Sequence, residues 1–154
     1  SISETYGLDV FISKKLGKHN LWTSYTISKS LEYFDFFVNK NWNLSPQNQL
    51  HEFKTAMIFN FHPIHCSINY VYGSGLTYSK DSGENIRLPY NRLDIAAKYI
   101  FNVKKIKAEA GLSILNVLNN KNLSLNSFSN FSAQEDQFVL STPFTPFVFV
   151  KLKL

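Results

Sequence analysis

The sequence predicts an all-β, antiparallel fold, and three observations lead to that prediction. Aromatic residues make up 16% of the 154 residues, whereas there are six glycines and five prolines. Aromatic and β-branched side chains favour strands because they pack well on a pleated surface. Apolar and polar residues also alternate strictly in about seven segments. Finally, the longest apolar runs are short, such as 147–150, whereas a membrane-spanning helix needs about 20 apolar residues.

Each alternating segment predicts a strand with one apolar face and one mixed face. In the clearest segment Phe53, Met57 and Phe61 point away from Glu52 and Lys54. The apolar faces carry aromatic residues near the segment ends, as do transmembrane barrel strands that have lipid outside and water or a plug inside. The charges that we expect to face the barrel lumen are Asp9, Lys54, Arg92, Asp94, Lys98 and Glu109.

The expected connections between strands alternate in length. Short turns are predicted at 17–18, 62–64 and 102–104, and long polar links at 31–50, 75–90 and 119–143. Outer-membrane barrels have short periplasmic turns and long extracellular loops. Seven strands in an open sheet would leave two unpaired edges in lipid, which is costly. Because the sequence also opens at Ser1 without a secretory signal, we expect an excerpt of a longer protein, with partner strands upstream or in other chains.

Several passages together resemble one family over nearly the whole chain. They are LWTSYTISKS at 21–30, QLHEFK at 49–54, YGSG at 72–75, YNRLD at 90–94, LSILNVLN at 112–119 and FTP at 144–146. In order and spacing they resemble the terminal barrel strands of TonB-dependent outer-membrane receptors, particularly of the Bacteroidetes type. The resemblance implies that 1–154 is the carboxy-terminal part of an antiparallel transmembrane β-barrel of about 22 strands. The plug domain of that family is absent from this chain, and the final Leu154 departs from the family's usual aromatic residue.

The function that this resemblance implies is uptake of a bulky nutrient, such as a siderophore, an oligosaccharide or a peptide, in the bacterial outer membrane. The implied partners are outer-membrane lipid, a plug domain, the remaining barrel strands, TonB and, in related uptake pairs, a surface lipoprotein. A second hypothesis is a non-transporting barrel that serves as a structural subunit of a secretion or assembly complex. A third is a soluble β-sandwich binding module. The scattered lysines do not line one helix face, which argues against nucleic acid as a partner.

The long links hold the candidate substrate-binding residues, because loops on a rigid scaffold carry recognition. Aromatic rings and amides suit sugars, peptides or siderophores through stacking and hydrogen bonding. The alternative is that these loops only pack over the barrel mouth, and for the Asn-rich link at 116–130 we favour that alternative. The candidate substrate-binding residues are Tyr33, Phe34, Phe36, Trp42, Tyr78, Asn119 and Asn122.

Catalytic and metal sites are not predicted. The cluster His62-Pro63-Ile64-His65-Cys66 contains soft-metal ligands, but alternation directs His65 and Cys66 to opposite faces of a strand. Asp81 and Glu84 lack the spacing of a calcium loop. No Ser, His and acid grouping suggests a nucleophile elbow, so we expect no enzyme activity and no cofactor.

Overall fold

A computed structural model confirms the all-β, antiparallel fold. It describes residues 2–34, 41–45, 48–79, 85–122 and 141–153. Within these ranges no helix is long and apolar enough to cross a membrane. The strands are β1 (Ile2–Leu16), β2 (His19–Tyr33), β3 (Asn43–Leu44), β4 (His51–Phe61), β5 (Ile64–Ser79), β6 (Asn85–Val103), β7 (Ile106–Leu115) and β8 (Thr145–Lys153).

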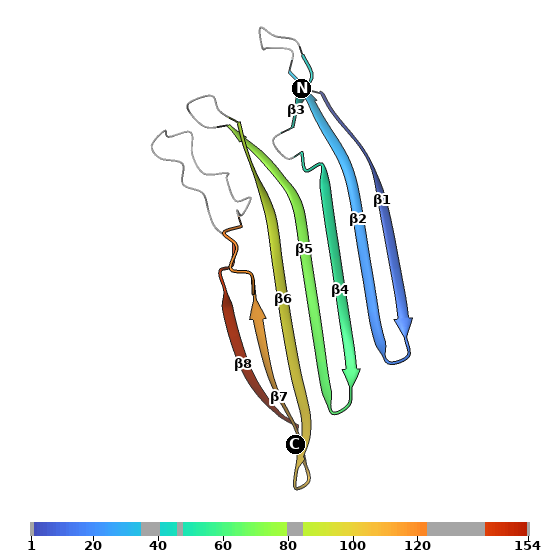
Figure 1. Cartoon of the computed structure of the whole chain (residues 1–154), viewed down its shortest axis with the longest axis vertical. Coiled ribbons are helices and arrows are strands. Elements are labelled where there is room, and N and C mark those ends of the chain that lie inside the picture. Colours follow the sequence, from blue (N-terminus) through green and yellow to red (C-terminus); the bar gives the residue numbers. More distant parts are fainter. Residues whose placement is uncertain (1, 35–40, 46–47, 80–84, 123–140, 154) are drawn as a thin grey trace.

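The strands form one curved layer in which each long strand lies beside the next one along the chain. The order is β1-β2-β4-β5-β6-β7-β8, and the short β3 pairs with β2. Figure 1 shows the three short turns at the lower end of the sheet and the long links at the upper end. Among the described residues β1 pairs only with β2 and β8 only with β7, so both are edges and the sheet is not closed.

The register confirms the predicted division into two faces. Met57 pairs with both Leu21 and Ile68, and Ile68 pairs in turn with Ile95, so the apolar side chains of four strands share one face. Lys54 pairs with Val71, which places it on the opposite face. A slip of one residue in any strand would move its apolar set to the other face. The hydrophobic pattern and the observed register therefore agree.

The first two short turns lie where the sequence predicts them, whereas the third lies at 104–105 instead of the predicted 102–104, because β6 continues to Val103. Two-residue turns at 17–18, 62–63 and 104–105 join β1 to β2, β4 to β5 and β6 to β7. Gly17 adopts a φ of 61°, a left-handed conformation that glycine reaches without steric cost. Figure 1 shows that the turns step progressively along the sheet from β1 to β7.

The predicted long links are partly wrong. The link at 75–90 is mostly strand, because pairing resumes at Leu76–Leu88 after a bulge and continues to Ser79–Asn85. The glycines and serine at 73–75 indicate a loop in the sequence, yet they form this bulge. Gly75 has a φ of 91°, and an added Cβ would lie 2.2 Å from the Leu88 carbonyl oxygen, so only glycine fits there.

The other two long links also differ from their predicted bounds. The first begins after Tyr33, not at Leu31, and includes the unpredicted β3. The third begins directly after Leu115, three residues earlier than predicted, and its residues 123–140 lie outside the described ranges.

Candidate functional site

The apolar face of the sheet runs without interruption from β1 to β8. One row across it joins Phe59, Cys66, Ala97, Leu112 and Val148 through the register of five strands. Most described side chains of this face are exposed or half-buried, reaching 78% at Val148, although Ala108 is buried. Soluble monomers rarely expose apolar patches larger than a few hundred Å². A face that spans seven strands therefore requires a cover, either lipid or protein.

Aromatic side chains border this apolar face on both sides. We call His19, Phe59, Phe61, Tyr99 and Phe101, which lie near the short turns, the turn-side belt. The His19 and Phe61 rings are 4.8 Å apart, and those of Tyr99 and Phe101 are 5.7 Å apart. Their shared position next to the turns places them along one border of the aliphatic surface.

A second group of rings lies toward the long links, and we call it the loop-side belt. It consists of Tyr25, His51, Phe53, Tyr70 and Tyr72, with a 2.8 Å hydrogen bond between Tyr25 Oη and His51 Nδ1. Along β4 the two belts are eight residues apart, at Phe53 and Phe61, which corresponds to about 26 Å along the strand at ~3.3 Å per residue and to roughly 20 Å of height for a strand tilted by about 40°. Transmembrane barrels present an apolar band of about 25 Å between aromatic girdles.

The opposite face carries the six charges that the sequence assigns to the lumen, and the register places them all there. Arg92 Nε lies 2.8 Å from Asp94 Oδ1 within β6, and Lys98 Nζ lies 3.7 Å from Glu109 Oε2 across β6 and β7. Lys54 forms an ion pair with its strand neighbour Glu52. Asp9 lies on the exposed edge strand β1. Five of the six charges are thus neutralised by neighbours on the same face, with Glu52 as the partner of Lys54.

Aromatic side chains also lie on this mixed face near its two edges. The Phe11 and Trp22 rings stack at 6.2 Å between β1 and β2. At the other edge the Phe149 ring covers Gly111, where an added Cβ would approach the ring to 2.4 Å. The mixed face therefore carries charges in its centre, together with the exposed Ile58 of β4, and has aromatic side chains toward β1 and β8.

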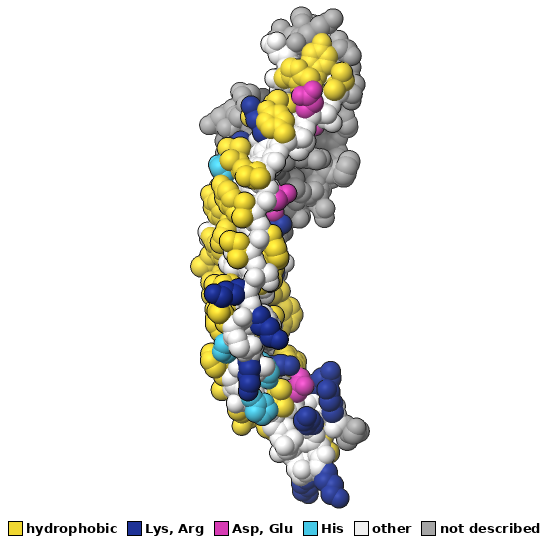
Figure 2. Space-filling model, turned by 90° about the vertical axis from the view of Figure 1, so that its right-hand side faces the viewer, with side chains coloured by type: hydrophobic (Ala, Val, Ile, Leu, Met, Phe, Trp, Pro, Cys, Tyr) yellow, Lys and Arg dark blue, Asp and Glu magenta, His cyan; other side chains and the backbone are white. Residues whose placement is uncertain are grey.

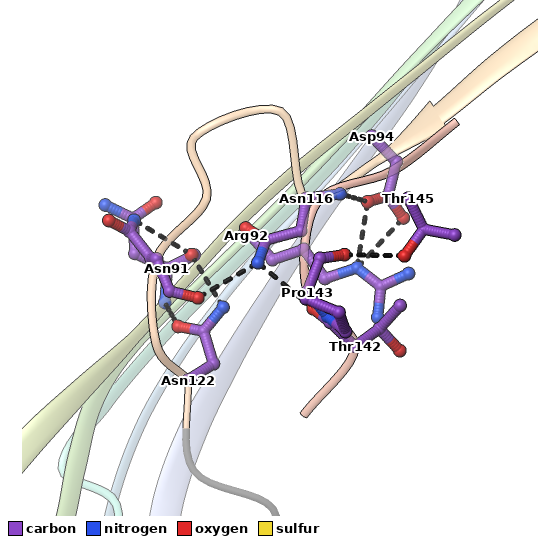
Figure 3. Close-up of polar contacts among 9 residues, drawn as sticks. Asn91, Arg92, Asp94, Asn116, Asn122, Thr142, Pro143 and Thr145 are labelled. Carbon is purple, nitrogen blue, oxygen red and sulfur yellow. Dashed lines mark hydrogen bonds and ion pairs between the residues drawn. The ribbon is translucent and has the colours of Figure 1, made fainter. Parts of the chain in front are cut away.

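The link between β7 and β8 is fixed by Asn116, which is fully buried (Figure 3). Its Nδ2 donates to the carbonyl oxygens of Asn120 (2.9 Å) and Thr142 (3.0 Å), so it joins the two ends of the link. Its backbone N–H donates to Asp94 Oδ1 at 2.8 Å. The single Nε–H of Arg92 in turn donates a bifurcated hydrogen bond to both carboxylate oxygens of Asp94. We call Asn91, Asp94, Asn116, Asn122 and Thr142 the Asn116 anchor.

Asn122 is the second buried asparagine of this anchor, and its side chain makes hydrogen bonds to β6 of the kind that a neighbouring strand would make. The pairing of β6 with β7 ends at Ile95–Ile114, which leaves the backbone of Asn91 without a β7 partner. Asn122 Oδ1 accepts from the Asn91 N–H at 2.7 Å, and Asn122 Nδ2 donates to the Asn91 oxygen at 2.9 Å. One carboxamide therefore supplies both hydrogen bonds that a neighbouring strand would otherwise supply.

The link between β2 and β4 is held in a similar way by Asn48, which is 3% exposed. Asn48 Oδ1 accepts from the Ser30 N–H at 2.8 Å, and the Ser45 N–H donates to the Ser30 oxygen at 3.0 Å. Gln49 lies over Gly73, where an added Cβ would approach Gln49 Oε1 to 2.5 Å. We call Ser30, Ser45, Asn48 and Gln49 the Asn48 anchor. No local sequence pattern marks this anchor, because its members are ordinary loop residues.

The predicted substrate-binding aromatics are only partly described. Tyr33 and Trp42 lie together, with ring centroids 5.6 Å apart. Phe34, which follows Tyr33 in the chain, is half-buried. Phe36 lies outside the described residues. The backbone of Tyr78 belongs to β5, but its side chain lies outside the described part. A binding role for these aromatics remains a prediction.

The two predicted asparagines occupy different environments. Asn119 is exposed, and its Oδ1 accepts from the Phe144 N–H at 3.4 Å. Asn122 is 2% exposed and uses its carboxamide within the Asn116 anchor. Whether either residue contacts substrate, or the Asn-rich link only packs over a barrel mouth, remains a prediction.

The candidate metal ligands are separated by the pleat. His65 pairs with Asn60 on the mixed face, whereas Cys66 pairs with Phe59 on the apolar face. Among the described residues no group of three His, Cys, Asp or Glu side chains is arranged to hold a metal ion. Asp81 and Glu84 lie outside the described ranges.

No protein-family model, curated protein or solved structure matches this chain. The resemblance to TonB-dependent receptors therefore rests on the quoted sequence passages alone, and the function has to be argued from the geometry of the sheet.

Proposed function

We propose that this chain forms carboxy-terminal strands of an outer-membrane β-barrel that belongs to a TonB-dependent nutrient receptor. The observation that supports this proposal most strongly is the exposed apolar face, bordered by the turn-side belt and the loop-side belt. Its height and its aromatic borders fit the lipid-facing band of a barrel. A soluble β-sandwich would instead cover such a face with a second sheet.

The two edges of the sheet are accounted for by the same proposal. An open edge in lipid leaves backbone N–H and C=O groups without partners, at several kcal/mol each in order of magnitude. Strands β1 and β8 would therefore pair with further strands, of the same polypeptide or of other chains, in a barrel of about 22 strands.

A transport role follows from the resemblance and is compatible with the arrangement of the links. The long links extend from one end of the sheet, where they would gather a siderophore, an oligosaccharide or a peptide. Both anchors fix the bases of these links on the strands. The mixed face would line the lumen and contact a plug domain that TonB rearranges.

One observation favours the alternative of a structural barrel without transport. The charges Lys54, Arg92 and Lys98 already have acidic partners on the same face. A lumen whose charges are matched internally does not depend on a plug for charge neutralisation. The alternative function is therefore a structural subunit of a secretion or assembly complex in the outer membrane.

The experiment that tests the proposal is to fractionate cells and measure the intact mass of the native polypeptide extracted from outer membranes. We expect a mass several times the 17.7 kDa of this chain, including a plug and further strands. A polypeptide without a plug supports the structural alternative. Recovery in the soluble fraction without detergent would contradict both barrel functions.

A further inference from the structure

The turn end of the sheet is strongly basic. Figure 2, which views the molecule from its β1 side, shows Lys and Arg side chains gathered toward the lower end. We call the following eight residues the turn rim: Lys14, Lys15, Lys18, Lys104, Lys105, Lys107, Lys151 and Lys153. All eight side chains are exposed.

Acidic side chains do not balance this charge. In the turn-end segments 10–22, 57–69, 97–110 and 149–153, all of which are described, Glu109 is the single acidic residue. Its carboxylate already lies 3.7 Å from Lys98 Nζ. Lys107 and Lys153 moreover stand directly opposite each other in the register of β7 and β8. Like charges in that position destabilise a sheet, so an external anion would stabilise the turn rim.

The spacing of the lysines indicates the kind of anion. Successive turns are separated by two strands, which corresponds to about 10 Å at ~4.8 Å between strands. The turn that holds Lys18 and the turn that holds Lys105 are therefore about 20 Å apart. This distance exceeds the reach of one small anion. It fits an extended surface on which many negative groups are distributed.

The neighbouring apolar face identifies that surface as a lipid leaflet. Lys18 directly precedes His19 of the turn-side belt, and Phe101 lies three residues before Lys104. Aromatic rings with this placement sit at the headgroup level of a bilayer. Lys14 lies on the apolar face, since it pairs with Leu21, and a lysine there extends its ammonium group toward the headgroups. Lys14 and the turn lysines Lys18, Lys104 and Lys105 thus follow the border at which lipid phosphates would lie, whereas Lys15, Lys107, Lys151 and Lys153 lie on the mixed face beside it.

We propose that the turn rim binds the headgroups of anionic phospholipids in the leaflet on the turn side of the sheet. This inference rests on the proposed barrel function and adds a lipid preference to it. It predicts that anionic lipid accumulates around this end of the protein through charge attraction that salt weakens.

The test uses the complete protein reconstituted into phosphatidylcholine vesicles that contain spin-labelled phosphatidylglycerol or spin-labelled phosphatidylcholine. Electron paramagnetic resonance measures the fraction of each label that the protein immobilises. We expect a preference for phosphatidylglycerol of roughly several-fold, falling as salt is raised. The double variant Lys18→Gln and Lys105→Gln, which removes one cation from each of two turns, should lose part of this preference. The matched control, Lys29→Gln and Lys121→Gln at the loop end, should keep it.

The outcomes separate this inference from the barrel proposal. Immobilisation of both lipids without preference would overturn the lipid inference and leave the barrel intact. The same would follow from an equal loss of preference in both double variants, or from a preference that free inorganic phosphate abolishes while chloride at the same ionic strength does not. If neither label is immobilised, the protein has no lipid contact, and the barrel proposal fails as well. Acetylation of the lysines in native membranes provides a second measurement. If the turn-rim lysines are protected there while the reconstituted protein shows no lipid preference, the lipid inference is overturned in favour of an acidic polypeptide that covers the turn rim.

Discussion

The two long links at the loop end are both held by buried asparagines, but they are held to different extents. The Asn48 anchor supplies one side-chain acceptor to the backbone of Ser30. The Asn116 anchor uses two buried carboxamides, of Asn116 and Asn122, and is supported by the Arg92–Asp94 ion pair. In both places an amide side chain takes over hydrogen bonds where a neighbouring strand is missing. The denser anchor belongs to the longer link, in which β7 and β8 are separated by 29 residues, 116–144.

The largest effect is expected from Asn116→Ala. The carbonyl oxygens of Asn120 and Thr142 would both lose their donor, and alanine would be strained at a φ of 51°. We expect the local opening free energy to fall by about 2–4 kcal/mol. Hydrogen exchange at the Val117 and Ser141 amides of the complete protein measures this change.

Asn116→Gly is the matched control for backbone strain, because glycine accepts the left-handed conformation. It should destabilise by less than alanine and still by more than any substitution in the Asn48 anchor. Unchanged exchange at Val117 in both variants would contradict the role that we assign to Asn116.

A smaller effect is expected from Asn122→Ala, which removes the two hydrogen bonds to the Asn91 backbone. The loss should be about 1–3 kcal/mol, seen as faster exchange of the Asn91 amide. Asn120→Ala serves as the control, since Asn120 is exposed and makes one 3.1 Å bond to the same carbonyl oxygen. Equal effects of the two substitutions would show that burial of Asn122 does not matter.

The smallest effect is expected from Asn48→Ala, which leaves the Ser30 N–H without its acceptor. We expect a loss of about 1 kcal/mol, confined to exchange at Ser30 and its neighbours. A loss as large as that of Asn116→Ala would reverse the order of the two anchors and contradict the comparison.

The sequence predicts the strands, their faces and the short turns, because these features follow from local alternation and turn residues. Both anchors escape such an analysis. Asn122 bonds to Asn91, which lies 31 positions away, and no local pattern marks that pairing. The bulge at Gly73–Leu76 was missed for a related reason. Glycine and serine are as typical of a loop as of a bulge. Only the pairing with β6 shows that the strand continues beyond them.

The central claim is that the apolar face contacts lipid, and the single cysteine of this chain offers a direct test. A fluorophore on Cys66 lies on the apolar face, and a fluorophore introduced by Ser67→Cys in a Cys66→Ser background lies on the mixed face. The complete protein, with any cysteines elsewhere replaced, is reconstituted into vesicles whose acyl chains carry nitroxide quenchers. Ile68→Cys and Asn69→Cys in the same background extend the series. We predict strong quenching at 66 and 68 and weak quenching at 67 and 69. Equal quenching at all four positions, or none, would contradict a lipid-facing role of this face.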